Sequence, residues 1–161
     1  MYILGIDPGS TLIGYGLIKK TSKNELEEIT HGVLKITEKD LSQKIASLAK
    51  RLRALIKKTK PDLVGVEKLF FAKNKKTALE VAHARGVIML IVLESRLPVV
   101  EYTPAEIKQA VTGYGSADKK MIQKMVSIIL KTELHSDDNA ADALAVAITT
   151  ANRYEYEQRT R

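Results

Sequence analysis

Two carboxylates stand at the ends of apolar, strand-like runs, where an ionised group is costly to bury. Asp7 follows the run Tyr2–Ile6 and precedes a Pro-Gly turn. Glu67 follows the run Leu63–Val66 in the same way. A charge at the end of a buried strand costs free energy unless a cation or a hydrogen-bond network compensates for it. We interpret both residues as candidates for chemistry, although Asp7 as a cap of its turn and Glu67 as a solvated strand end remain open.

A third carboxylate lies near the other end of the chain, in a segment rich in alanine. Asp142 comes four residues after Asp138 and three after Asn139, so in a helix all three share one face. The surrounding alanines would let this helix approach a sheet closely and carry Asp142 toward the two strand ends. Asp138 is equally an ordinary residue for the start of a helix.

Oxygen ligands from two strand ends and a helix are the ligands that hard divalent cations bind. Mg²⁺ takes oxygen donors in octahedral geometry and keeps several waters. Two such ions, about 3.5–4 Å apart, hold the attacking water and the leaving oxygen of a phosphodiester. The three histidines have no spacing typical of a metal site. The carboxylates therefore predict a site for two Mg²⁺ ions, with Mn²⁺ as a substitute.

The elements that must position these carboxylates indicate one α/β domain over residues 1–161. Three runs joined by short turns predict an antiparallel meander of strands: Tyr2–Ile6, Gly14–Lys20 and Glu28–Ile36. Two further apolar runs predict the strands Leu63–Val66 and Val99–Tyr102. Helical periodicity predicts the helices, at about Leu41–Lys58, Lys75–Ser95, Pro104–Val111, Asp118–Leu130 and Asn139–Tyr154. The order predicts a mixed sheet flanked by helices.

The helix over Leu79–Leu93 is apolar on more than one side, whereas a surface helix with one buried face would be striped. It is either a central core helix or a helix that packs on the sheet by one side and on a second subunit by the other. A twofold dimer is the usual form of such an assembly. Arg85 lies in this helix and is interpreted as a packing or dimer contact.

The composition is basic, with 26 Lys and Arg against 19 Asp and Glu, a net charge of +7 and a pI near 9.5. Such an excess favours a polyanionic partner, with nucleic acid before membrane, or serves solubility alone. Cysteine is absent, which excludes disulfides and thiolate metal sites. The N-terminus lacks the pattern of a signal peptide, and the longest apolar run, Val87–Leu93, is too short to cross a bilayer. We expect a cytoplasmic protein with no membrane association.

An aromatic pair and a lysine cluster directly follow Glu67. They are Phe70, Phe71, Lys73, Lys75 and Lys76. An aromatic ring in such a loop can stack on a DNA base, which is worth roughly 1–3 kcal/mol per base, and the lysines can neutralise phosphates. The alternative is that the rings enter the core and that the lysines are solvated.

Five segments resemble, in order and spacing, the motifs of the RuvC-type crossover-junction endodeoxyribonucleases, the bacterial Holliday junction resolvases. They are GIDPGSTLIGYGLI, VEKLFFAKN, ARGV, GYGSADKKMIQKMV and AADALAVAITTA. The resemblance covers nearly the whole chain. It implies a ribonuclease-H-like fold, a homodimer, Mg²⁺ dependence and paired symmetric nicks in four-way DNA junctions. It also implies cooperation with the RuvA–RuvB branch-migration machinery.

The same resemblance assigns roles to the carboxylates. Asp7, Glu67 and Asp142 match the family's metal-binding residues. We expect Asp7 to bridge the two ions, with Glu67 and Asp142 binding one each. The fourth position, usually Asp or His, holds Asn139 here. Asn offers a carbonyl oxygen but no charge, and it cannot act as a general base. Either Asn139 coordinates weakly, or Asp138 has taken over the role, which its spacing from Asp142 favours.

The resemblance also points to groups that would bind DNA. Phe70 matches the residue that would stack on a base unpaired at the crossover. Lys108 and Lys119 match lysines near the scissile phosphate, and Lys120 is the adjacent alternative. Lys119 lies in the first turn of its helix, whose free N–H groups can also receive a phosphate. The positive charge of Lys119 would stabilise the negative charge on the phosphate during attack.

Two other functions fit parts of the sequence. The first hairpin resembles that of ATPases of the actin and sugar-kinase type, but those proteins need two lobes to enclose the nucleotide, and 161 residues have room for one. A non-catalytic junction-binding module is conceivable because Asn139 stands at the fourth position. The sequence favours a metal-dependent, structure-selective DNA nuclease over both.

Overall fold

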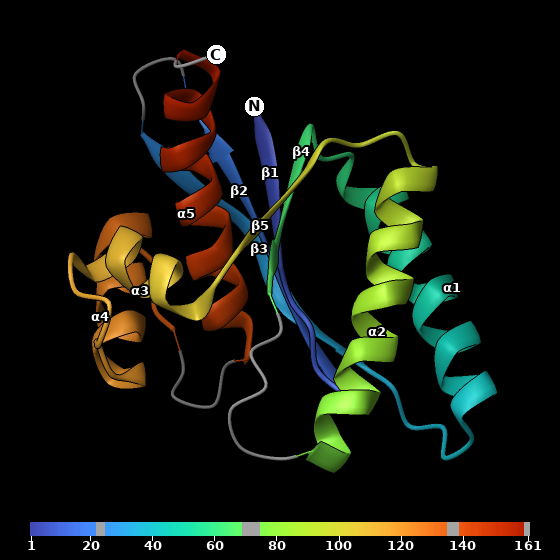
Figure 1. Cartoon of the computed structure of the whole chain (residues 1–161). Coiled ribbons are helices and arrows are strands. Elements are labelled where there is room, and N and C mark those ends of the chain that lie inside the picture. Colours follow the sequence, from blue (N-terminus) through green and yellow to red (C-terminus); the bar gives the residue numbers. More distant parts are fainter. Residues whose placement is uncertain (22–24, 69–74, 135–138, 160–161) are drawn as a thin grey trace.

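A computed structural model describes residues 1–21, 25–68, 75–134 and 139–159. Its five strands are β1 (Tyr2–Asp7), β2 (Leu12–Lys20), β3 (Leu26–Lys35), β4 (Leu63–Glu67) and β5 (Val99–Tyr102). Its five helices are α1 (Leu41–Thr59), α2 (Lys75–Glu94), α3 (Pro104–Thr112), α4 (Lys119–Leu130) and α5 (Asn139–Arg159). The strands form one sheet in the order β3-β2-β1-β4-β5 (Figure 1).

The sheet is mixed, as the sequence predicts. β1, β2 and β3 pair antiparallel, whereas β4 pairs parallel with both β1 and β5. The parallel pairs need crossovers, which α1 and α2 provide. The first three strands are therefore the predicted meander. β4 and β5, which alternate with helices along the chain, complete the sheet.

Helices cover both faces of the sheet, with α3, α4 and α5 on one side and α1 and α2 on the other (Figure 1). Because successive side chains of a strand point to opposite faces of the sheet, the strands contribute side chains to two hydrophobic cores. Ile3 and Ile18 pack with α4 and α5, while Leu4 and Leu17 pack with α1 and α2. The two cores hold the layers in place and leave the strand ends free for a site.

A row of glycines crosses the centre of the sheet beneath α5. Gly5 of β1 lies beside Gly16 of β2 and Gly65 of β4 in the register. A Cβ on Gly5 would overlap the carbonyl oxygen of Ala143 and come within 2.6 Å of the amide nitrogen of Ala147. The close approach that the alanines predict is thus real, and it needs glycine on the sheet as well as alanine on the helix.

α2 packs on the sheet by one side only. Ile88, Ile91 and Val92 are buried there. On the other side Leu79, Leu90 and Leu93 are 62%, 55% and 58% exposed. Of the two interpretations of this helix, a wholly buried core helix is therefore wrong. Arg85, on the same helix, donates to Glu101 of β5, which makes it a packing contact within the chain.

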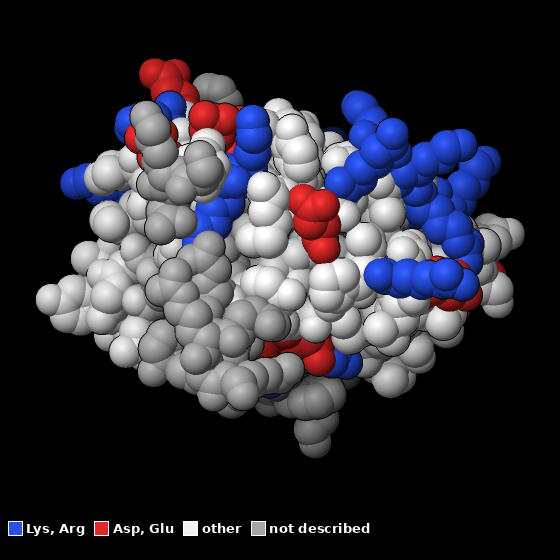
Figure 2. Space-filling model, turned by 90° about the horizontal axis from the view of Figure 1, so that it is seen from above, with Lys and Arg blue, Asp and Glu red and all other residues white. Residues whose placement is uncertain are grey.

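Many basic side chains lie far from the ends of β1 and β4 that carry Asp7 and Glu67. Figure 2 looks onto the opposite end, where Lys and Arg gather over the ends of α1 and α2. α1 finishes with Lys57 and Lys58 and is capped by Lys60, an arrangement that complements the helix dipole. Net charge alone therefore does not identify a DNA-binding face. None of the helices in the described ranges is long and apolar enough to span a membrane.

Candidate active site

The site begins at the carboxyl ends of two neighbouring parallel strands. Ile6 pairs with Val66, so the next residues, Asp7 and Glu67, end β1 and β4 side by side. Asp7 is half-buried, and its carboxyl shares a hydrogen bond with that of Glu67. The parallel register therefore brings together two carboxyls that stand 60 positions apart in the chain.

Both strand-end carboxyls are electrostatically strained. Burial, then the charge and hydrogen bond of Glu67, then the charge of Asp142, raise the pKa of Asp7 well above its usual range, and Lys119 opposes them. Burial and the charge of Asp142 raise the pKa of Glu67, against the opposing hydrogen bond from Asp7 and the charge of Lys108. Like charges held together out of water favour protons or a metal cation.

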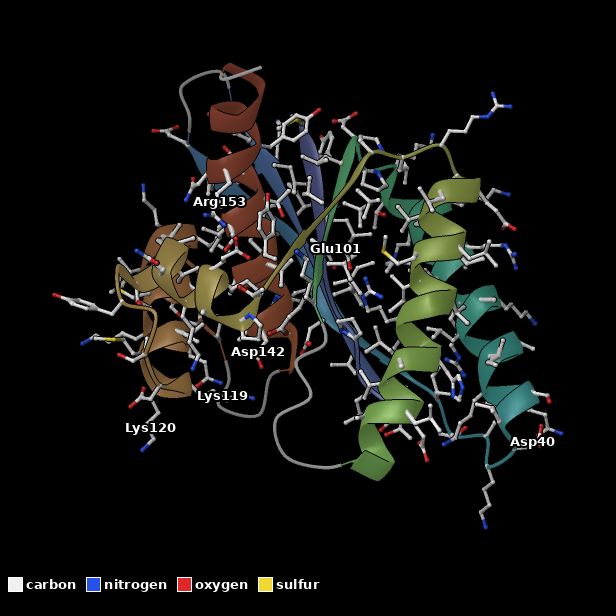
Figure 3. All side chains as sticks on the ribbon, in the orientation of Figure 1. Asp40, Glu101, Lys119, Lys120, Asp142 and Arg153 are labelled. Carbon is white, nitrogen blue, oxygen red and sulfur yellow. The ribbon has the colours of Figure 1, made fainter. Side chains whose placement is uncertain are left out.

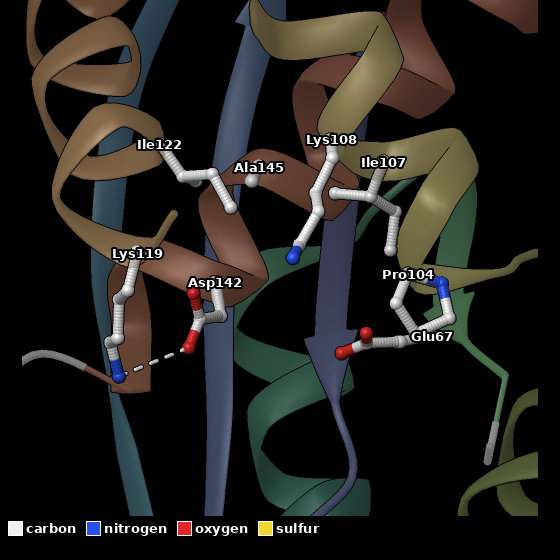
Figure 4. Close-up of a pocket in the computed structure, with 8 residues that line it drawn as sticks. All are labelled: Glu67, Pro104, Ile107, Lys108, Lys119, Ile122, Asp142 and Ala145. Carbon is white, nitrogen blue, oxygen red and sulfur yellow. Dashed lines mark ion pairs between the residues drawn. The ribbon is translucent and has the colours of Figure 1, made fainter. Parts of the chain in front are cut away.

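Asp142 completes the acidic group from the first turn of α5. Its Oδ2 forms an ion pair with Nζ of Lys119, and the two atoms are 3.3 Å apart (Figure 4). Lys119 is the first residue of α4, whose N-cap Asp118 accepts a hydrogen bond from the amide of Met121. The cap fixes where α4 begins, and so it fixes where the Lys119 ammonium meets the carboxylate.

A pocket of about 190 Å³ opens between these groups. Its charged lining is Glu67, Asp142, Lys108 and Lys119, and its apolar lining is Pro104, Ile107, Ile122 and Ala145. Lys108 reaches in from α3, with its ammonium between Asp142 and Glu67 (Figure 4). The pocket is smaller than the roughly 300–1,000 Å³ of typical small-molecule sites, and it has room for a phosphate group.

The described carboxylates fit a hard cation by their chemistry but not yet by their placement. Within the described ranges, no three His, Cys, Asp or Glu side chains lie close enough together to hold an ion. The carboxyls of Asp7 and Glu67 are hydrogen-bonded to each other, while the carboxylate of Asp142 forms its ion pair with Lys119. The metal cluster predicted from the sequence therefore stays a prediction, supported by the oxygen-only donors and the raised pKa values.

Several of the predicted site residues lie elsewhere or are not described. Lys120 is exposed, does not line the pocket and points away from Asp142 (Figure 3). Phe70, Lys73 and Asp138 lie outside the described residues. Asn139 begins α5 and Lys75 and Lys76 begin α2, as the sequence predicts, but the positions of these three side chains are likewise outside the description.

The N-terminal cap of α3 was not predicted from the sequence. Thr103 caps this helix, and Glu106 returns the bond in a capping box, with Pro104 at the first turn. The pattern Thr-Pro-x-Glu is a recognisable start signal that was available in the sequence. Glu106 also binds Arg153 of α5 at 2.8 Å, which no local pattern reveals.

A mixed five-stranded sheet with carboxylates at two adjacent strand ends, and a third on the helix packed across them, defines the ribonuclease-H-like class of nucleases. Comparisons with known proteins narrow the class. Residues 3–150 match the family model described as crossover junction endodeoxyribonuclease RuvC. The chain belongs to the RuvC family of crossover junction endodeoxyribonucleases, the Holliday junction resolvases of DNA recombination and repair.

Individual relatives agree with this assignment. The crossover junction endodeoxyribonuclease RuvC of Desulforamulus reducens is 49% identical, covering 94% of this chain and 93% of the relative. That of Thermosipho melanesiensis is 46% identical, covering 91% and 94%. Thermus thermophilus RuvC in complex with a Holliday junction substrate is 29% identical with a TM-score of 0.88, covering 98% and 96%. The predicted ribonuclease-H-like fold and resolvase activity are confirmed, and neither the ATPase lobe nor the non-catalytic module is supported.

Proposed function

We propose that this resolvase cuts four-way DNA junctions by paired symmetric nicks, with two Mg²⁺ ions held by Asp7, Glu67 and Asp142. The observation that carries the proposal is the pair of strand-end carboxyls side by side at the ends of β1 and β4. Burial and the charge of Asp142 raise the pKa of both. Bound Mg²⁺ would supply an activated water and neutralise the leaving 3′-oxygen. Mn²⁺ shares the preference for oxygen ligands and is the expected substitute.

The lysines would act on the phosphate. A cation beside Asp142 would weaken its 3.3 Å pair with Lys119 and free that ammonium for the scissile phosphate. Lys108 already projects into the pocket beside Glu67 and would bind a second phosphate oxygen. Electrostatic stabilisation by these two residues is the part of catalysis that the chain itself supplies.

Recognition of the junction is proposed from the relative whose complex contains one. Thermus thermophilus RuvC is described with a Holliday junction substrate. On this chain, Phe70 would stack on an unpaired base, and Lys73, Lys75, Lys76 and Lys120 would bind phosphates near it. The DNA substrate supports a cytoplasmic location. Cooperation with RuvA–RuvB is proposed from the family.

A homodimer is proposed through the exposed side of α2. Leu79, Gly86, Leu90 and Leu93 recur at helical spacings of seven, four and three residues, a pattern typical of helix pairing. A Cβ on Gly86 would meet nothing within 4 Å in the single chain. Glycine inside a helix costs about 1 kcal/mol relative to alanine, so a closely approaching second helix would explain it. Two symmetric sites also match a twofold junction.

The dimer predicts the outcome of a charge placed on this side of α2. Leu90→Glu should give a monomer by sedimentation, because burying an unpaired carboxylate costs several kcal/mol. The monomer should bind one junction without making the second, paired nick. Ile128→Glu on α4 is the matched control, since Ile128 is 58% exposed and Leu90 is 55% exposed. A dimeric Leu90→Glu would contradict the proposed interface.

The proposed function is tested by comparing a mobile four-way junction with a linear duplex of the same sequence. We expect symmetric nicks in the junction with Mg²⁺ or Mn²⁺, no cutting with a chelator, and an intact duplex. Equal cutting of the duplex would contradict structure selectivity. An uncut junction at saturating metal would contradict the nuclease itself.

If Asp138 and not Asn139 is the fourth metal ligand, alanine substitutions at these two positions should slow cleavage to different extents. Asp138→Ala should slow single-turnover cleavage by about 10–100-fold, the usual range when support for a metal site is lost. Asn139→Ala, the matched neighbour, should slow it less, because its side chain carries no charge. Unchanged cleavage in Asp138→Ala would leave Asn139 as the ligand, and Asn139→Asp should then raise the rate.

A further inference from the structure

One carboxylate joins the three elements that surround the back of the pocket. Glu106 accepts hydrogen bonds at Oε2 from the amide and hydroxyl of Thr103, both at 2.8 Å. Its other oxygen, Oε1, accepts from Nη1 of Arg153 on α5 at 2.8 Å. The guanidinium of Arg153 also lies over the ring of Tyr102, 5.7 Å from its centroid. The end of β5, the start of α3 and the body of α5 thus meet at Glu106.

These contacts lie directly behind residues of the pocket. Tyr102 pairs with Glu67 across β4 and β5, and its carbonyl oxygen accepts from the amide of Lys68 at 2.8 Å. Ile107 and Lys108, which directly follow Glu106 in α3, line the pocket. The place where α3 begins therefore sets where the Lys108 ammonium lies relative to the carboxylates.

α5 carries both partners of this arrangement. Asp142 is in its first turn, and Arg153 comes 11 residues later, about 16 Å along the axis. Arg153 holds α3 while the same helix presents Asp142 to the pocket (Figure 3). The separation between Lys108 and Asp142 is consequently fixed through one rigid helix and one ion pair.

The pair is permanently ionised but contributes little to folding. The hydrogen bond from the Thr103 amide, followed by Arg153, lowers the pKa of Glu106 to about 2. The side chains of Arg153 and Glu106 are 42% and 38% exposed, and exposed pairs of this kind add little to stability. An effect of the pair on activity would therefore be separable from an effect on folding.

We propose that Glu106 and Arg153 are positioning residues, which hold α3 against α5 so that Lys108 meets the scissile phosphate beside Glu67. The inference rests on the proposed function of this pocket. Neither residue touches the pocket, and each acts through the start of α3. Arg153 supplies the hold from α5, and Glu106 transmits it to the helix start through Thr103.

The test measures single-turnover cleavage at saturating enzyme, junction affinity and melting temperature for Arg153→Met and Arg153→Lys. Arg153→Met should cut about 10–100-fold more slowly, with junction affinity within about twofold of the parent, because a misplaced group costs rate more than binding. Arg153→Lys should recover part of the loss. Arg53→Met is the matched control, since Arg53 forms a 3.0 Å pair with Glu94 between α1 and α2. Both Met variants should lower the melting temperature to the same small extent.

A double-mutant cycle separates positioning from general loss of structure. In a Lys108→Ala background, Arg153→Met should have little further effect, because the residue that it positions is gone. Cleavage by Arg153→Met at the parent rate, or effects that multiply independently with Lys108→Ala, would overturn the inference. Normal cleavage by Asp7→Asn would instead overturn the proposed function, so the two failures are distinguishable.

Discussion

Asp7→Asn is expected to lower junction cleavage by about 10²–10³-fold while junction affinity stays near that of the parent. The magnitude follows the usual cost of removing an electrostatic group that acts on the transition state. Asn keeps the shape and one carbonyl oxygen but loses the charge that would hold a cation between β1, β4 and α5. Single-turnover cleavage and a gel-shift titration measure the two quantities. A variant that cuts at the parent rate would contradict the proposed site.

The same substitution should stabilise the metal-free protein. Burial and the carboxyl of Glu67 raise the pKa of Asp7 in the folded state, so the folded chain binds a proton more tightly than the unfolded chain does. The metal-free parent therefore loses stability as the pH rises from the usual Asp range through this raised pKa. The amide side chain of the Asp7→Asn variant cannot ionise, so the variant does not incur that loss.

Melting curves with a chelator measure this effect. Asp7→Asn should melt above the parent at pH 8, and the difference should shrink as the pH falls and Asp7 becomes protonated. Added Mg²⁺ should raise the melting temperature of the parent and have little effect on the variant. Identical melting temperatures across the pH range would contradict the electrostatic strain.

The second large effect is expected at Gly5, a residue without a side chain that lies beneath α5. Gly5→Ala should lower the free energy of unfolding by about 3 kcal/mol or more, at the upper end for overpacking. The added methyl would overlap the carbonyl oxygen of Ala143 and lie 2.6 Å from the amide nitrogen of Ala147. Both are helix backbone atoms that cannot rotate away, so α5 must move, and Asp142 must move with it. Cleavage by the folded fraction should fall as well.

Denaturant unfolding with Gly115→Ala as the control tests this prediction. A Cβ on Gly115 would meet only the carbonyl oxygen of Ala105, at an ordinary 3.8 Å. The control should therefore unfold within about 1 kcal/mol of the parent, the range of alanine substitutions at compatible glycines. Equal stability of the two variants would mean that α5 does not pack on the sheet as closely as described.

The sequence predicts most of the fold because its signals are local. Alternating apolar runs, helical periodicity and three prolines, Pro61, Pro98 and Pro104, mark most of the elements within a residue or two. The exception is α5, which ends at Arg159 and not at the predicted Tyr154. The ends of β2 and β3 were predicted less well. β2 begins at Leu12 because it pairs with Lys35, and β3 begins at Leu26 because it pairs with Lys20. Such pairing lengthens strands beyond their own hydrophobic pattern.

The candidate site also has features that local sequence signals predict and features that they do not. Asp7 and Glu67 could be placed together because parallel strands end at one edge of a sheet. The ion pairs of Lys119 with Asp142 and of Glu106 with Arg153 join different helices, and nothing local in the sequence reveals them. The glycine row depends on strand register, which a single sequence leaves open.

Titration with Mn²⁺ would show whether the carboxylates of β1, β4 and α5 bind a divalent cation. Electron paramagnetic resonance would follow free Mn²⁺ with the parent and with Asp7→Asn, each bound to an uncut junction in which the scissile linkages are blocked. We expect the parent to bind Mn²⁺ that Mg²⁺ displaces, and the Mn²⁺ affinity of Asp7→Asn to be at least about tenfold weaker. Equal Mn²⁺ affinity in the two proteins would contradict the proposed metal site.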